Sequence, residues 1–125
     1  MNLKVLQYIS DVTRIKEEDL SYNVIMNYRN KILNFLKGLK VIYAIPNSPI
    51  SKRTYRVLDL WPDSCNSHKF TSSDVTYTIT KYFRDIKKYN IKRTDLPTLH
   101  VGKTFNGGKV LVPLEVCKLF YICYK

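Results

Sequence analysis

Tyrosines stand beside lysines and arginines at three places in the chain, and this combination of side chains could bind a polyanion. The three runs are Arg53–Arg56, Lys81–Arg84 and Lys87–Tyr89. A cation attracts a phosphate, whereas an aromatic ring stacks on a base and a phenol donates a hydrogen bond to a phosphate oxygen. This interleaving favours a single-stranded nucleic acid as the partner.

The net charge of the chain points the same way. Its 125 residues include 21 lysines and arginines against 10 aspartates and glutamates, which gives a formal net charge of +11. Such an excess attracts a nucleic acid or an acidic membrane surface. No stretch approaches the ~20 apolar residues of a membrane span, and the first residues do not form a secretory signal. A hydrophobic fraction of 45% suffices for one domain with one core.

Residues suited to metal binding or catalysis are few and scattered. The three cysteines, which form no CxxC pair, are Cys65, Cys117 and Cys123. The two isolated histidines are His68 and His100. The adjacent acids at 17–19 resemble a metal-binding cluster. They precede Ser21, a helix N-cap candidate, and their negative charges stabilise the N-terminus of that helix. We therefore expect no metal, no cofactor and buried, reduced thiols.

Two helices are predicted to open the chain. Apolar residues at helical spacing predict a short helix over 3–12, and a longer one follows Ser21, with an apolar stripe from Ile25 to Leu36. Gly38 stands just past its end, a common position for glycine.

The remainder is predicted as short strands with one inserted helix. Strands are expected over 39–45, 55–61 (ended by Pro62), 69–71, 75–77, 98–101 and 109–112. A loop is expected over 46–54, a turn over 102–108 and a helical turn from Pro113. Thr78 can cap a helix whose apolar face includes Tyr82 and Phe83. This order indicates an α+β fold around a small barrel.

Six sequence motifs in a fixed order resemble the PAZ domain of Argonaute proteins, from about Leu3 to Cys117. They are Gly38-Leu39-Lys40-Val41, Tyr55-Arg56-Val57, Tyr82-Phe83, Tyr89-Asn90-Ile91, Leu96-Pro97-x-Leu99-x-Val101-Gly102 and Val112-Pro113-Leu114-Glu115-Val116-Cys117. The last motif is more similar to the Argonaute branch than to the Dicer or Piwi branches.

The resemblance implies a small oligonucleotide-binding-fold-like β-barrel with an inserted β-hairpin/helix flap and two N-terminal helices. One PAZ domain would cover 1–125, with helices in 1–37, barrel strands in 39–61 and 98–117, and the flap in 66–92. The ends of the chain suggest a monomeric domain excised from a larger Argonaute, and the expected location is the cytoplasm, with the nucleus as a second site.

The function that the resemblance implies is non-catalytic. Such a domain anchors the single-stranded 3′ end of a small RNA (siRNA or miRNA), either a two-nucleotide overhang or a guide tail, independently of sequence. Two alternatives stay open, a small metal-dependent nuclease and a basic protein-interaction module.

The resemblance also assigns roles to single residues. The hydroxyl groups on the phosphate between the last two nucleotides would be those of Tyr55, Tyr82 and Tyr89. The ring on the terminal nucleotide would be Phe70. The cations along the RNA backbone would be Arg53, Arg56, Lys88 and Lys109. The apolar packing residues of the pocket would be Leu111 and Val112.

This sequence departs from the family pattern at three points. Ile45 stands where Argonautes often have a phosphate-binding histidine, and Leu111 replaces a common tyrosine. About two extra residues precede Tyr89.

Structural interpretations of the same residues compete with these roles. Tyr82 and Phe70 also suit a core, and the basic helix face suits a solvated surface. The tyrosines interpreted as packing residues are Tyr8, Tyr22, Tyr28, Tyr43, Tyr77, Tyr121 and Tyr124.

Overall fold

The computed structural model describes residues 2–46, 48–105 and 108–120, apart from the side chains of residues 2, 103–105, 108–109 and 120. Six strands form one antiparallel sheet: β1 (Asn2–Lys4), β2 (Lys40–Ile45), β3 (Ser48–Ser64), β6 (Pro97–Phe105), β7 (Gly108–Pro113) and β8 (Cys117–Phe120). Their order is β1-β8-β2-β3-β6-β7, so β1 and β7 lie at the two edges. The fold is therefore α+β with an antiparallel sheet.

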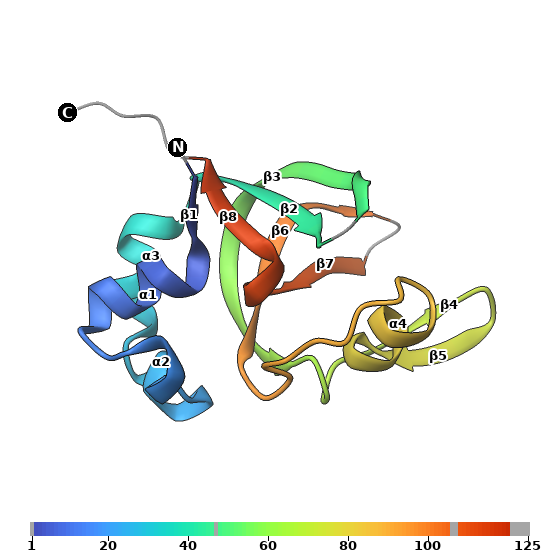
Figure 1. Ribbon diagram of the computed structural model, residues 1–125, viewed down its shortest axis with the longest axis horizontal. Coiled ribbons are helices and arrows are strands. Elements are labelled where there is room, and N and C mark those ends of the chain that lie inside the picture. The colour runs from blue at the N-terminus through green and yellow to red at the C-terminus, as the bar shows by residue number, and fades with distance from the viewer. Residues whose placement is uncertain (1, 47, 106–107, 121–125) are drawn as a thin grey trace.

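The N-terminal helices pack together on one side of this sheet (Figure 1). They are α1 (Val5–Thr13), the 3-10 turn η1 (Glu17–Asp19), α2 (Tyr22–Asn27) and α3 (Arg29–Leu36). The Ser21 hydroxyl accepts a hydrogen bond from the Val24 amide at 3.2 Å, which confirms the predicted N-cap. None of the described helices has the length and apolar character needed to span a membrane.

The N-terminal helices differ from the prediction in two ways. The single long helix is two helices, because the backbone of Tyr28 (φ −101°, ψ 14°) leaves the helical region between them. The first helix begins at Val5 rather than Leu3, because Leu3 pairs with Leu119 as part of β1. Neither β1 nor β8 was predicted.

The flap is a separate unit inserted between β3 and β6. It consists of a hairpin, β4 (Lys69–Ser72) and β5 (Val75–Thr78), followed by α4 (Ile79–Asp85). The Thr78 hydroxyl accepts a hydrogen bond from the Lys81 amide at 3.1 Å and caps this helix, as predicted. In Figure 1 the flap projects beyond the end of the sheet that lies away from the N-terminal helices.

The predicted loop over 46–54 was wrong, because β3 is one long strand from Ser48 to Ser64. The prediction was wrong because the prolines at 49 and 62 were interpreted as strand breaks. Both are exposed, and Pro62 lies where the pairing of β3 with β6 is irregular, between Trp61 and Ser64. Proline is tolerated in a strand at such places because no ladder N–H is needed there.

The strand β6 also continues further than predicted. It passes through Gly102 (φ +66°) to Phe105, so the expected turn over 102–108 is largely strand. After β7, a 3-10 turn over Leu114–Val116 follows Pro113, close to the expected helical turn.

Two hydrophobic cores hold the molecule together. The larger lies between the helices and the sheet and includes the fully buried Ile9, Ile25, Leu36, Val57 and Leu99. The smaller joins the flap to the sheet and consists of Ile45, Cys65, Ile79, Phe83 and Ile91. The expected buried thiols are found at Cys65 and Cys117; Cys123 lies outside the described residues.

Candidate nucleic-acid interface

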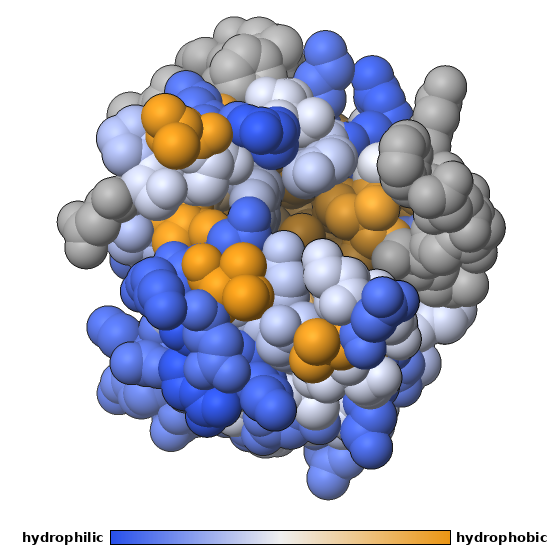
Figure 2. Space-filling model, turned by 90° about the vertical axis from the view of Figure 1, so that its right-hand side faces the viewer, coloured by the Kyte–Doolittle hydropathy of each residue, from blue (hydrophilic) through white to orange (hydrophobic). Residues whose placement is uncertain are grey.

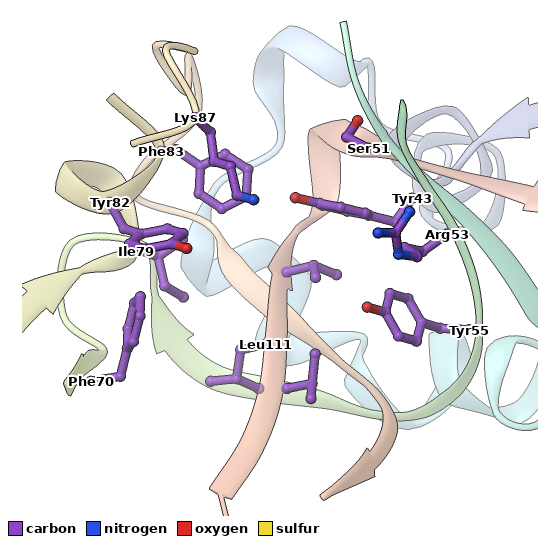
Figure 3. Close-up of a pocket in the computed structure, with 12 residues that line it drawn as sticks. Tyr43, Ser51, Arg53, Tyr55, Phe70, Ile79, Tyr82, Phe83, Lys87 and Leu111 are labelled. Atoms are coloured by element: carbon purple, nitrogen blue, oxygen red, sulfur yellow. The ribbon is translucent and has the colours of Figure 1, made fainter. Parts of the chain in front are cut away.

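A pocket of about 360 Å³ lies between the sheet and the flap. Figure 3 shows its walls, with β2, β3 and β7 on one side and α4 and β4 on the other. The lining residues are Tyr43, Ser51, Arg53, Tyr55, Phe70, Ile79, Tyr82, Phe83, Lys87, Val110, Leu111 and Val112. On this face of the molecule hydrophobic surface lies at the bottom of a hollow, surrounded by hydrophilic side chains (Figure 2).

The sheet contributes two phenols and a guanidinium to the pocket. Alternate residues of a strand share a face, so Ser51, Arg53 and Tyr55 of β3 point the same way. The register with β2 places Tyr43 opposite Arg53. The rings of Tyr43 and Tyr55 are 6.3 Å apart, measured between centroids. Gly102 leaves room for Tyr55, because a Cβ atom at residue 102 would lie 3.0 Å from its Cδ1.

The flap contributes a third phenol, a stacking ring and a second cation. Tyr82 of α4 and Phe70 of β4 meet edge to face, with centroids 5.2 Å apart. The ammonium group of Lys87 lies 5.8 Å from the centre of the Tyr82 ring. Phe83, the next residue of α4, meets Tyr43 edge to face at 6.4 Å and so links the flap to the sheet.

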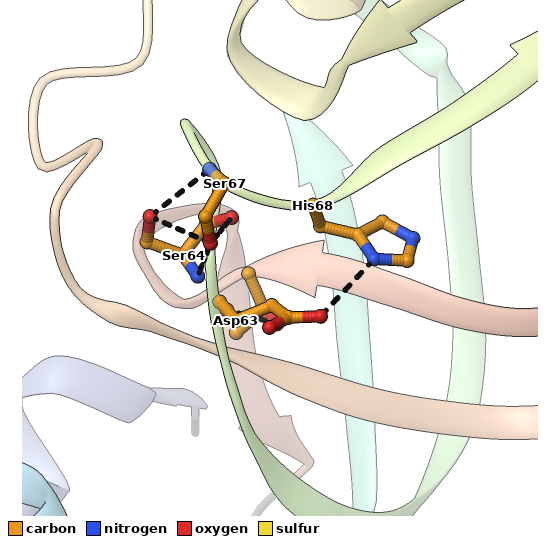
Figure 4. Close-up of polar contacts among 5 residues, drawn as sticks. Asp63, Ser64, Ser67 and His68 are labelled. Carbon is orange, nitrogen blue, oxygen red and sulfur yellow. Dashed lines mark hydrogen bonds and ion pairs between the residues drawn. The ribbon is translucent and has the colours of Figure 1, made fainter.

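A polar turn sets the position of the flap where it leaves β3 (Figure 4). The Ser64 amide donates to the Ser67 hydroxyl at 2.8 Å, and the Ser67 amide donates to the Ser64 hydroxyl at 3.2 Å. Nδ1 of His68 lies 3.4 Å from the Asp63 carboxylate. The His68 ring in turn stacks on Phe70 with an interplanar angle of 19°. These contacts connect the turn to the pocket wall.

The electrostatic character of the pocket suits an anion. Arg53 and Lys87 line it, and none of the described lining residues is acidic. The hydroxyl groups of Tyr43, Tyr55 and Tyr82 make no hydrogen bond to another described residue, and all three point into the pocket (Figure 3). Neutral phenols can donate to an anion. The pocket is therefore lined by three hydroxyl donors and two cations that suit an anionic ligand.

Six of the residues assigned from the sequence come together here. They are Tyr55, Tyr82, Phe70, Arg53, Leu111 and Val112. Arg56 does not, because it lies on the other face of β3 and its guanidinium donates to the Gly38 carbonyl at 2.6 Å. Lys88 is exposed and outside the pocket lining, with a left-handed backbone (φ +59°). The side chain of Lys109 lies outside the described residues.

Tyr89 does not line this pocket but a second one, beside β2 and β8, so its predicted role at the phosphate stays a prediction. Its hydroxyl donates to the Glu115 carboxylate at 2.6 Å. The same carboxylate accepts hydrogen bonds from the backbone amides of Lys92 and Arg93, the latter at 2.7 Å. Burial, and then the bond to Glu115, raise the pKa of Tyr89 to about 12.

The chain forms a turn between α4 and Tyr89. After α4 the amides of Ile86 and Lys87 both donate to the Tyr82 carbonyl, and Lys88 reverses the chain direction with its positive φ. The Tyr89 amide then donates to the Phe83 carbonyl at 2.9 Å. Lys87 lies beside Tyr82 and lines the pocket, whereas Lys88 and Tyr89 do not.

Sequence reasoning missed Tyr43 and Ser51, and it named Lys87 only as part of a basic run without assigning it to the pocket. Tyr43 was interpreted as a packing residue because the resemblance assigned it no role. If β3 had been predicted as one continuous strand, its pairing with β2 would have placed Tyr43 opposite Arg53, and this pairing would have indicated that Tyr43 faces the pocket. Ile45, which the resemblance matched to a histidine of the family, is buried at 4% exposure in the smaller core.

The described residues contain no group of three or more histidine, cysteine, aspartate or glutamate side chains placed to hold a metal ion. Glu17 and Glu18, the acids considered for a nuclease, line a different pocket, of about 810 Å³, beside β2 and β8.

Comparison with known proteins places this geometry in a family. The model of the PAZ domain matches residues 6–124. Protein argonaute 18 of Oryza sativa subsp. japonica is 34% identical over 95 residues, which are 74% of this chain and 8% of that protein. The chain thus spans less than a tenth of the length of this relative.

Two solved structures are similar over almost the whole chain. One is a Drosophila Ago-PAZ domain in complex with 3′-end 2′-O-methylated RNA, with a TM-score of 0.81 at 26% identity; the match covers 97% of this chain and 100% of that one. The other is the Drosophila Argonaute 2 PAZ domain, described as a structural basis for 3′ end recognition of nucleic acids. Its TM-score is 0.72 at 28% identity, covering 95% of this chain and 94% of that one.

Proposed function

The chain belongs to the PAZ domain family, and on this premise we propose that its pocket anchors the single-stranded 3′ end of a small RNA in RNA silencing. The observation that carries the proposal is the convergence of three phenols, one stacking ring and two cations between the sheet and the flap. The similar Drosophila structure in complex with a 3′-end RNA supports it.

The binding roles follow from the position of each side chain. Tyr55 and Tyr82 donate hydrogen bonds to the phosphate that joins the last two nucleotides, and Arg53 and Lys87 balance its charge. Phe70 stacks on the terminal nucleotide. Because every base has a π-face, a stack of ~1–3 kcal/mol tolerates any sequence. The apolar residues that pack on the terminal sugar are Leu111 and Val112.

Three further cations act on the rest of the RNA. Arg56 and Lys88 attract the upstream backbone, together with Lys109. Discrimination between RNA and DNA comes from the terminal 2′-hydroxyl, which only RNA offers.

The setting of this activity is a larger Argonaute protein. We infer that the sheet serves as an oligonucleotide-binding-fold-like barrel, that residues 1–125 act as one monomeric PAZ domain without catalytic activity, and that other domains of the protein carry out any cleavage. The chain spans only a small share of argonaute 18, which supports the inference that it is one domain of a larger protein. The cytoplasm and the nucleus are the compartments proposed for it.

A fluorescence anisotropy titration tests the proposal. A short RNA duplex with a two-nucleotide 3′ overhang should bind at least about 10-fold more tightly than the blunt duplex, because only the overhang can enter the pocket and stack on Phe70. Equal affinities would contradict the proposal. Incubating the same labelled RNA with Mg²⁺ or Mn²⁺ checks the nuclease alternative, for which turnover is the required result.

A further inference from the structure

We propose that the Tyr43 hydroxyl is a third donor to the terminal phosphodiester, beside the hydroxyls of Tyr55 and Tyr82. This inference rests on the proposed function and adds to it a residue outside the pattern by which the family was recognised.

The position of Tyr43 in β2 directs its hydroxyl into the pocket. Its side chain extends from the sheet toward the flap, with the oxygen facing the space between Lys87 and Tyr55 (Figure 3). The strand register puts it directly opposite Arg53. A phosphate held by the Arg53 guanidinium and the Tyr55 hydroxyl therefore lies within the region that Tyr43 faces.

The ring of Tyr43 is held on both sides. Tyr55 lies 6.3 Å away on the sheet side, and Phe83 lies 6.4 Å away on the flap side at an interplanar angle of 88°. Tyr43 also packs against both hydrophobic cores. This packing orients the hydroxyl before RNA binds, which lowers the entropy cost of forming a hydrogen bond.

The hydroxyl has an unused capacity to donate. It makes no hydrogen bond to another described residue, although the side chain is half-buried. Burial, and then the neighbouring Tyr55, raise the pKa of Tyr43 to about 12. The phenol therefore stays protonated well above neutral pH. A half-buried donor that lacks a protein partner is satisfied when an anion enters the pocket.

Ile45, two residues further along β2, cannot donate a hydrogen bond to the phosphate. Its side chain is apolar and 4% exposed, and it packs in the smaller core with Cys65 and Phe83. The bulge between Tyr43 and Ile45 shifts the register of the hairpin at this point. Of these two β2 residues, only Tyr43 lines the pocket.

The experiment compares Tyr43→Phe with the wild-type chain, using the 3′-overhang duplex with either a natural or an uncharged methylphosphonate linkage between its last two nucleotides. The substitution keeps the ring and removes only the hydroxyl. We expect it to weaken binding of the natural RNA about 10- to 100-fold. It should change binding of the methylphosphonate RNA far less, because the charged acceptor is gone.

Tyr28→Phe is the matched control, since Tyr28 is 38% exposed between α2 and α3 and outside the pocket. Unchanged affinity of Tyr43→Phe for the natural RNA would overturn the inference, and so would an equal loss on both RNAs, which indicates packing alone. Thermal unfolding confirms that each variant is folded. If the wild-type chain already failed to prefer the overhang over the blunt end, the proposed function itself would be at fault rather than the role of Tyr43.

Discussion

Phenols suit a pocket that must hold a phosphate without changing charge. A tyrosine hydroxyl is neutral at physiological pH and donates a short hydrogen bond to an anionic oxygen, while its ring packs against neighbours. Tyr82 combines both properties, because its ring contacts Phe70 and Tyr77 while its hydroxyl faces the pocket. The core and binding interpretations of this residue are therefore compatible.

Tyr82 and Tyr89 should give opposite results when each is changed to phenylalanine. Tyr82→Phe should weaken RNA binding by about 1.5–3 kcal/mol, the loss of one hydrogen bond to a charged group, and leave stability unchanged. Tyr89→Phe should lower the free energy of unfolding by about 1–2 kcal/mol, because it breaks a partly exposed bond to Glu115. RNA titrations and urea unfolding of both variants check this. Loss of RNA affinity in Tyr89→Phe without loss of stability would contradict the placement of Tyr89.

The pH dependence of stability gives a second check on Tyr89. Its folded pKa of about 12 lies above the ordinary value of 10.0, so the protonated phenol is the form that folding favours. The stabilisation is therefore complete below pH 10 and is lost as the pH rises toward 12. The difference in unfolding free energy between wild type and Tyr89→Phe should shrink over that interval. A difference that stays constant would show that the hydroxyl is not bonded as described.

At the level of elements, the β2–β3 hairpin and the flap together form the pocket. The hairpin supplies Tyr43 and Tyr55 in adjacent strands, and α4 supplies Tyr82 and Phe83 from successive positions of one short helix. Gly102 of β6 underlies Tyr55, with a positive φ and no side chain. The path of β6 therefore helps to hold Tyr55 in place.

Gly102→Ala should weaken RNA binding, because its Cβ would lie 3.0 Å from the Tyr55 ring and displace it. The positive φ adds a backbone cost of about 1 kcal/mol to stability. Gly38→Ala is the control, since Gly38 also has a positive φ (+89°) but no atom within 4 Å of the added Cβ. It should lose similar backbone stability and keep its RNA affinity. Equal RNA affinities of the two variants would contradict the role of Gly102.

Local signals in the sequence were enough to predict the capped helices and the flap. Ser21 and Thr78 both cap helices as expected, and the hairpin before α4 has the predicted strands. Long-range pairings were not predictable in this way. β1 and β8 are short strands that form only by pairing with distant partners. The length of β3 was not predicted because its prolines were interpreted as strand breaks.

The same distinction explains the candidate site. Tyr55 and Tyr82 could be placed because they belong to the motifs of the resemblance, and Phe70 because of its position between these motifs; all three line the pocket. The positions of Lys87 beside Tyr82 and of Tyr89 beside Glu115 depend on how the chain turns after α4, and sequence spacing alone does not show that turn.

For the whole molecule, the charge of +11 should make RNA binding depend on salt. For single-stranded RNA the logarithm of affinity falls against the logarithm of salt concentration with a slope of about −0.7 for each phosphate neutralised. Arg53→Gln should reduce the magnitude of that slope by about 0.7, because Arg53 lines the pocket. Arg84→Gln is the control, as Arg84 pairs with Asp85 on the surface of α4. Equal slopes for both variants would remove Arg53 from the phosphate site.

Reversing the polarity of the overhang shows whether the pocket takes the 3′ end of RNA. Two duplexes of equal length and charge, one with a two-nucleotide 3′ overhang and one with a two-nucleotide 5′ overhang, are titrated against the wild-type chain. We expect at least about 10-fold tighter binding of the 3′ overhang, because only that end can stack on Phe70 while its last phosphate reaches the phenols. Equal affinity for the two polarities would contradict it.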